Sequence, residues 1–174
     1  ESCDWGGSES YVDYEKMYMS RYKLLRKAYE RSDFLKDKDY EIFLKEEKNW
    51  LTDYCLFMAI KNSQKGICWI DWPDELKDRH SKAVKEAEKE LETEINFYRF
   101  QQYCFTTQWR KLKKYANKKG ISIIGDVPIY VALDSSDAWA NPEMLQFDKD
   151  HNPKSVAGCP PDAFSATGQL WGNP

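Results

Sequence analysis

The sequence predicts a helix-rich α/β chain, and two observations lead to this class. Three stretches between Asp13 and Lys119 repeat apolar residues at steps of three and four, the spacing of helices with one buried face. Gly120 then separates the last stretch from a short β-branched run that ends at an acidic turn. Helix, glycine, apolar strand and acidic turn form half of a β-α-β unit, so we expect three helices that lead into a strand of a parallel sheet.

The first predicted helix begins near Asp13, which can cap it, and runs to about Arg31. Six of its residues are spaced for one buried face: Tyr14, Met17, Tyr18, Leu24, Leu25 and Ala28. After a polar linker, the second helix spans roughly Tyr40 to Asn62, with Gly66 as its C-terminal stop. Its apolar residues also recur at three- and four-residue steps: Phe43, Leu44, Trp50, Leu51, Tyr54, Cys55 and Met58.

The segment from Cys68 to Pro73 is an aromatic loop, in which Trp69 and Trp72 are either packing rings or ligand platforms. Packing is the favoured interpretation for both, and also for Trp50 and Trp109. A third helix, or two helices in line, is predicted from Ser81 to Lys119. The charges of its first half are typical of a solvated face.

The stretch from Gly120 to Trp139 carries the first candidate site. Ile121 to Ile124 reads as a buried strand, and Asp126 stands where that strand should end. Barrel enzymes place their chemistry at the C-terminal ends of parallel strands, because the strand is rigid and the loops open into one cavity. The alternative is that Asp126 closes a turn or caps a helix, since Asp is a common turn residue.

After Trp139 the sequence becomes irregular. Met144, Leu145 and Phe147 could form a short strand, whereas residues 156–174 hold three prolines and three glycines without any helical or strand period. An ordered loop of this kind often carries function.

Composition limits the classes of function. With 26 basic and 29 acidic residues the net charge is −3, which gives no electrostatic case for nucleic acid or an anionic membrane surface. No apolar run approaches membrane-spanning length. The five cysteines are scattered and only two histidines accompany them, so a zinc site is not expected and a reducing, cytoplasmic context is favoured. The 15% aromatic content is a weak indication of a ligand that stacks on rings, and core packing explains most of it equally well.

Six segments of the chain resemble the 4-α-glucanotransferases (amylomaltases, or disproportionating enzymes) of glycoside hydrolase family 77. The two most specific are GISIIGDVPIYVALDSSDAWANPEMLQFD and AGCPPDAFSATGQLWGNP. The others are VDYEKMYMSRYKLLRKAYER, NWLTDYCLFMAIK, WIDWPDELKDR and FYRFQQYCFTTQW. The resemblance covers nearly everything from Tyr11 onward.

The resemblance implies a fragment of a (β/α)₈ TIM barrel with a helical insertion. Residues 1–119 would form the insertion and barrel helices, and residues 120–174 the third barrel strand, Ile121 to Val127, with the first conserved region and an active-site loop. It also implies retaining transfer of α-1,4-glucan segments between maltooligosaccharides, without a metal or organic cofactor. Both catalytic carboxylates would then lie beyond Pro174, so none is assigned in this chain.

Asp126 matches the family aspartate that supports the sugar subsite at the point of cleavage. Gln169 and Trp171 resemble donor-side sugar contacts, and Pro160 to Ser165 resembles a flexible loop over the groove. Ala163 stands where many relatives have Tyr, so the aromatic pair of the loop tip is not carried over. The remaining predicted substrate-binding residues are Tyr130, Asp134, Asp162, Phe164, Ser165 and Asn173.

Two alternatives from other classes stay open. The chain could be a helical interaction module whose aromatic faces bind a partner helix, or a glucan-binding protein without turnover. A simple helical scaffold has no reason to carry residues 126–139 together with residues 169–174.

Overall fold

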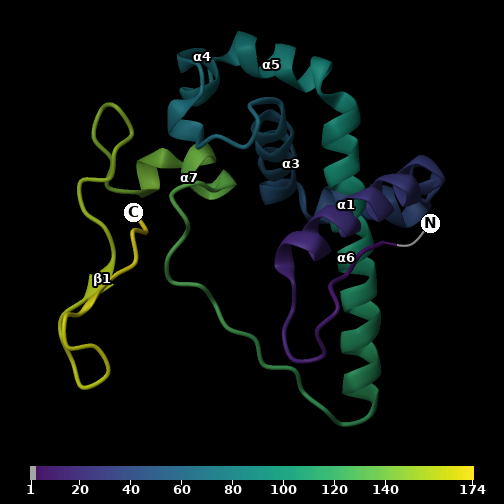
Figure 1. Ribbon diagram of the computed structural model, residues 1–174. Helices are drawn as coiled ribbons and strands as arrows, with labels where there is room; N and C mark the ends of the chain where they lie inside the picture. Colours follow the sequence, from purple (N-terminus) through teal and green to yellow (C-terminus); the bar gives the residue numbers. More distant parts are fainter. Residues whose placement is uncertain (1–2) are drawn as a thin grey trace.

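The computed structural model describes residues 3–174, in which helices form one body and a small hairpin lies apart from it (Figure 1). The α-helices are α1 (Tyr14–Glu30), α2 (Lys38–Glu46), α3 (Lys48–Ser63), α4 (Asp74–Lys77), α5 (Ser81–Glu90), α6 (Glu92–Lys118) and α7 (Ser136–Ala140). Short 3-10 helices are η1 (Phe34–Lys36), η2 (Trp69–Asp71) and η3 (Pro142–Met144), and the strands are β1 (Gly158–Cys159) and β2 (Gln169–Leu170). Within residues 3–174 no helix is both long and apolar enough to cross a membrane.

Aromatic side chains form the core of the helical body. Helix α3 packs against both α6 and α7, and Trp69 and Trp139 are fully buried beside it. The ring of Trp139 lies 5.9 Å from that of Phe57 and 5.7 Å from that of Trp72. Trp69 and Trp72 are therefore packing rings, as predicted. Trp50 and Trp109, by contrast, are 41% and 40% exposed, so the prediction that they pack was wrong for much of each ring.

Helix α1 crosses α6 near the middle of that long helix (Figure 1). Its inward face carries Tyr29, whose ring lies 5.6 Å from that of Phe97, and Arg26, which lies 3.6 Å above the same Phe97 ring and pairs with Glu94 at 2.8 Å. Most of the face predicted to be buried is not: Tyr14, Tyr18 and Leu24 are 71%, 50% and 52% exposed. The apolar period predicted the helix correctly, but α6 covers a different side of it.

The two longer helical predictions are each divided by one residue. The stretch from Tyr40 to Asn62 breaks at Glu47, and the stretch from Ser81 to Lys119 breaks at Leu91, as the prediction of two helices in line allowed. The turn at Glu47 lets α2 place Tyr40 and Phe43 against Tyr103 of α6, at ring distances of 5.4 and 5.5 Å.

The predicted strand from Ile121 to Val127 is absent, which corrects the expected barrel strand. Residues 121–128 have no regular secondary structure, and Ile124, Val127 and Ile129 are 93%, 80% and 88% exposed. A strand needs a neighbour to pair its N–H and C=O groups, and within residues 3–174 the only sheet is the β1-β2 pair. The segment runs instead as a long connection from the end of α6 to α7 (Figure 1).

The irregular tail contains a short antiparallel ladder, with Gly158 opposite Leu170 and Cys159 opposite Gln169. The strand expected at Met144 to Phe147 is reduced to η3 and one isolated bridge between Phe147 and Pro153. The tail is thus an ordered loop, as predicted, that is closed by a two-residue ladder. The division of the chain at residue 119 stays a prediction.

Candidate functional site

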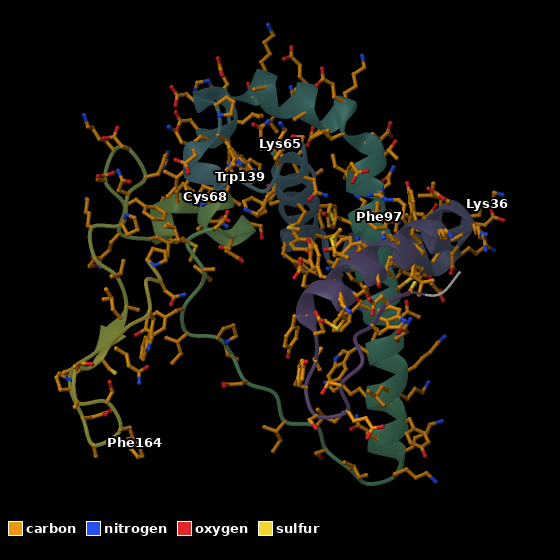
Figure 2. The ribbon with its side chains drawn as sticks, viewed as in Figure 1. Lys36, Lys65, Cys68, Phe97, Trp139 and Phe164 are labelled. Atoms are coloured by element: carbon orange, nitrogen blue, oxygen red, sulfur yellow. The ribbon has the colours of Figure 1, made fainter. Side chains whose placement is uncertain are left out.

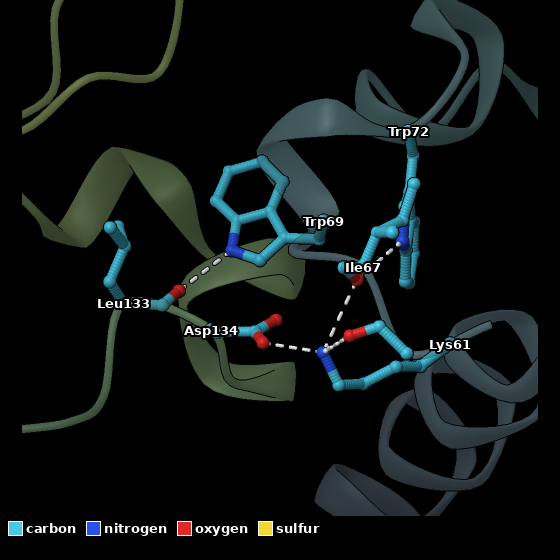
Figure 3. Close-up of polar contacts among 7 residues, drawn as sticks. Lys61, Ile67, Trp69, Trp72, Leu133 and Asp134 are labelled. Carbon is cyan, nitrogen blue, oxygen red and sulfur yellow. Dashed lines mark hydrogen bonds and ion pairs between the residues drawn. The ribbon is translucent and has the colours of Figure 1, made fainter. Parts of the chain in front are cut away.

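Residues 130–135 lead into α7, and side chains of α3 and η2 bond to two of them, Leu133 and Asp134 (Figure 3). Lys61, in the last turn of α3, donates from Nζ to the carbonyls of Gly66 at 3.1 Å and Ile67 at 3.3 Å, and it forms an ion pair with Asp134. The indole N–H of the buried Trp69 donates to the carbonyl of Leu133 at 2.7 Å. The segment is therefore bonded to the helical body through one side chain and one main-chain carbonyl.

The other end of the segment contacts the last residues of the chain. Asn173 donates from Nδ2 to the carbonyl of Val131 at 2.8 Å. The rings of Tyr130 and Trp171 lie 5.8 Å apart and are tilted by 51°, while the Trp171 indole N–H donates to Oε1 of Gln169 at 2.8 Å. Four predicted substrate-binding residues, Tyr130, Gln169, Trp171 and Asn173, are thus brought together. The two rings are 47% and 48% exposed, so they offer an open aromatic face.

The loop between β1 and β2 carries three more predicted residues. Oδ1 of Asp162 accepts hydrogen bonds from the backbone N–H groups of Phe164 at 2.8 Å and Ser165 at 2.7 Å. The Ser165 hydroxyl donates to the carbonyl of Gly168 at 2.7 Å. These bonds shape the loop and leave the Phe164 ring, 97% exposed, projecting from its tip (Figure 2).

Close backbone approach explains the two glycines at the base of this loop. A Cβ on Gly158 would lie 2.5 Å from the Gln169 carbonyl oxygen, and one on Gly168 would lie 2.6 Å from that of Cys159. Gly168 also has φ of +72°, which side chains disfavour. The N–H of Trp171 donates to the carbonyl of Ala157 at 2.9 Å, just outside the ladder. The position of Trp171 thus depends on this tightly packed strand pair.

Asp126 lies on the exposed connection rather than at a strand end. Its Oδ1 accepts a hydrogen bond from the N–H of Val127 at 2.8 Å, the local contact expected of a turn residue. Among the hydrogen bonds and ion pairs recorded within residues 3–174, none links Asp126 to the other predicted site residues. The Asp134 carboxylate pairs with Lys61, and no hydrogen bond between it and Tyr130 or Trp171 is recorded within residues 3–174.

Two further groups near the site have shifted pKa values. Burial raises the pKa of the Cys68 thiol, and the nearby Asp134 carboxylate adds to the rise. Backbone N–H groups of Asn152 and Asp150 donate hydrogen bonds to the Asp148 carboxylate and hold its pKa below the usual range. The same hydrogen bonds order the turn at residues 148–152.

A polar contact ties this turn to the helical body. His151 Nε2 of the turn lies 2.9 Å from Oδ1 of Asp78, directly after α4. No cluster of three or more His, Cys, Asp or Glu residues suited to a metal ion occurs in the described chain.

Comparison with known proteins identifies the family to which this arrangement belongs. The model of glycoside hydrolase family 77, described as 4-alpha-glucanotransferase, matches residues 3–174. The chain belongs to this family. The predicted family resemblance is thereby confirmed.

Individual relatives agree with this assignment to glycoside hydrolase family 77. The 4-alpha-glucanotransferase of Clostridium butyricum is 45% identical over 175 residues, which are 100% of this chain and 36% of that protein. That of Aquifex aeolicus is 47% identical over 161 residues, 92% of this chain and 33% of that protein. The structure of the amylomaltase from Streptococcus agalactiae in complex with acarbose matches with a TM-score of 0.90 and 41% identity, covering 98% of this chain and 35% of that one. This chain therefore spans about a third of the length of these family members.

Sequence reasoning did not select Lys61 or Trp69 as residues of the site. Lys61 lies 73 residues from Asp134, so no local pattern connects them. Trp69 was assigned to packing, which is correct for its ring, but its N–H partner is a main-chain carbonyl and has no signature in the sequence. A lysine in the last turn of a helix, where helix carbonyls lack partners, was the one available signal for Lys61.

Proposed function

We propose that this chain is part of a retaining 4-α-glucanotransferase that transfers α-1,4-glucan segments between maltooligosaccharides. The match of the family model to residues 3–174 carries the proposal. In this chemistry a carboxylate attacks the anomeric carbon while a second carboxyl group protonates the glycosidic oxygen, so that the glycosidic bond breaks and a glycosyl-enzyme forms. The 4-hydroxyl of another sugar then gives its proton to that second group and displaces the enzyme carboxylate. Two carboxyl groups about 5 Å apart are needed, one as nucleophile and one as acid and then base. We place both on residues of the complete enzyme that follow Pro174.

The role we assign to this chain is binding of the sugar chain. Trp171 and Tyr130 supply an aromatic face that is half exposed, suited to the apolar face of a glucose ring. Gln169 and Asn173 add amide groups beside it. Phe164, at the tip of the loop held by Asp162 and Ser165, closes over the sugar from another side.

The remaining parts of the proposal concern the complete fold. Residues 121–127 become the third strand of a (β/α)₈ barrel once neighbouring strands pair with them, which places Asp126 at the cleavage subsite and Asp134 near it. Residues 1–119 then supply the helical insertion and barrel helices. A cytoplasmic location fits the free thiols of all five cysteines.

The test is to express the complete reading frame and follow the products formed from maltotriose. Appearance of both glucose and longer maltooligosaccharides supports the proposal, whereas binding of glucan without turnover favours a glucan-binding protein. A protein that neither binds nor converts maltooligosaccharides would instead support the helical interaction module. The 174-residue chain alone is expected to be inactive, because it lacks the two carboxylates.

A further inference from the structure

We propose that Lys61 and Trp69 are positioning residues for the aromatic pair Tyr130–Trp171, so that the helical body determines where the sugar-stacking face stands. Neither side chain belongs to the face itself. The inference rests on the proposed function and adds to it the way in which the substrate site depends on α3 and η2.

Lys61 is held in a single geometry. An ammonium group has three N–H donors, and those of Lys61 have three acceptors: the carbonyls of Gly66 and Ile67 and the carboxylate of Asp134 (Figure 3). Its side chain is only 20% exposed, so water competes weakly for these contacts. The Asp134 carboxylate is therefore bonded to the C-terminal end of α3, where the helix dipole also favours the lysine charge.

Trp69 is held even more firmly. Its ring is fully buried and lies 6.0 Å from the ring of Phe147 and 5.2 Å from that of His151. The direction of its indole N–H is therefore set by the core. That N–H meets the carbonyl of Leu133 at 2.7 Å, so adjacent residues 133 and 134 are each bonded to the helical body.

These bonds matter because few other contacts hold the segment that precedes them, residues 122–132. Every residue from 121 to 130 is exposed, and between residues 122 and 132 no hydrogen bond to the helices is recorded in the described chain. Leu133 and Asp134 are thus the first residues after Ile121 for which a bond to the helical body is recorded in the described chain.

Two short connections link Leu133 and Asp134 to the rings of Tyr130 and Trp171. Tyr130 lies three residues before Leu133 in the same segment. Val131, between them, accepts the side-chain hydrogen bond of Asn173, which lies two residues from Trp171. A shift of residues 133–134 therefore displaces both rings together or separates them.

The test uses the complete enzyme with three single substitutions. Lys61→Met removes the charge but keeps the apolar stem, and Trp69→Phe keeps a buried ring but removes the N–H donor. Each is expected to raise KM for maltotriose roughly five- to tenfold with kcat within about twofold, because a displaced stacking face weakens ground-state and transition-state binding alike. The matched control is Lys77→Met: that side chain is 18% exposed and also pairs with an aspartate, Asp74, but within α4 itself. It should leave both constants unchanged.

A double substitution separates positioning from a general structural role. If Lys61 acts through the ring pair, Lys61→Met should add almost nothing to the rise in KM already caused by Trp171→Ala, whereas independent effects would multiply. Unchanged KM in both Lys61→Met and Trp69→Phe, or multiplicative effects in the double variant, would overturn the inference. If Lys61→Met does not fold, the KM of Trp69→Phe for maltotriose is the test: a rise supports the inference and an unchanged value overturns it. Wild-type enzyme that forms no products from maltotriose would refute the proposed function instead, so the two failures are distinguishable.

Discussion

Replacement of Trp171 by Ala in the complete enzyme is expected to lower kcat/KM for maltotriose by roughly 5- to 150-fold. This range corresponds to about 1–3 kcal/mol, the free energy that stacking on an aromatic side chain contributes for a nucleic-acid base. The apolar face of a sugar ring is expected to stack on Trp171 with a comparable free energy.

The surroundings of Trp171 support a loss of binding rather than of stability. One side of the ring faces Tyr130 at 5.8 Å, and its N–H is used by Gln169, yet 48% of the residue is exposed. It lies outside the buried core of the helical body. Truncation of such a side chain creates no buried cavity, so the melting temperature should change little.

The assay is the rate of glucose release from maltotriose, with melting temperature measured in parallel. Trp50→Ala is the matched control, because Trp50 is 41% exposed and its indole N–H also bonds to a neighbouring side chain, Glu47 at 2.8 Å. Trp171→Phe should retain an intermediate activity, since it keeps a smaller ring. If Trp171→Ala stays within twofold of wild type while remaining folded, Trp171 has a structural role and the stacking argument is wrong.

Three other substitutions and reactions test the structure in the complete enzyme. Gly168→Ala should lower transfer activity several-fold, because the new Cβ would lie 2.6 Å from the Cys159 carbonyl oxygen at a φ of +72° and would displace the strand pair beside Trp171. The melting temperature should change little, because this loop lies outside the buried core of the helical body; activity assays and thermal melts check both. Trp139→Ala removes a fully buried ring and should cost about 3–5 kcal/mol in the unfolding free energy of the helical body, measured by denaturant titration. Cys55 should resist alkylation at pH 8 until the protein unfolds, because its side chain is buried and burial raises its thiol pKa to about 12; mass spectrometry of labelled peptides would show this, and rapid labelling of the folded protein would contradict it.

The helices could be predicted from the sequence because their signals are local. Asp13 caps α1 by accepting a hydrogen bond from the N–H of Lys16, as its position predicted. Gly66 and Gly120 have φ of +80° and +76° at the ends of α3 and α6, which is the conformation that a helix-terminating glycine supplies. The breaks at Glu47 and Leu91 were not predicted as positions, because they depend on how each half packs against other helices.

The candidate site could be predicted only in part. Family motifs selected Gln169 and Trp171, and the structure brings both beside Tyr130. No motif indicates that Asp134 is bonded to Lys61, because an ion pair across 73 residues exists only after the chain has folded. The family motif therefore predicts which residues belong to the site, whereas the packing of α3 determines which of them form contacts with one another.

Two failures of predicted burial, on α1 and on the connection after α6, have one physical cause. An apolar pattern indicates which side of an element is covered in the folded protein, but not which segment covers it. Tyr14 and Tyr18 on α1, and Ile124 and Val127 on the connection after α6, all follow such patterns and all are exposed. Trp69, whose partners lie within residues 3–174, is fully buried. Within residues 3–174, apolar patterning therefore predicts burial only where another described segment covers the apolar side, which is why the core of α3, α6 and α7 agrees with the sequence and the predicted strand does not.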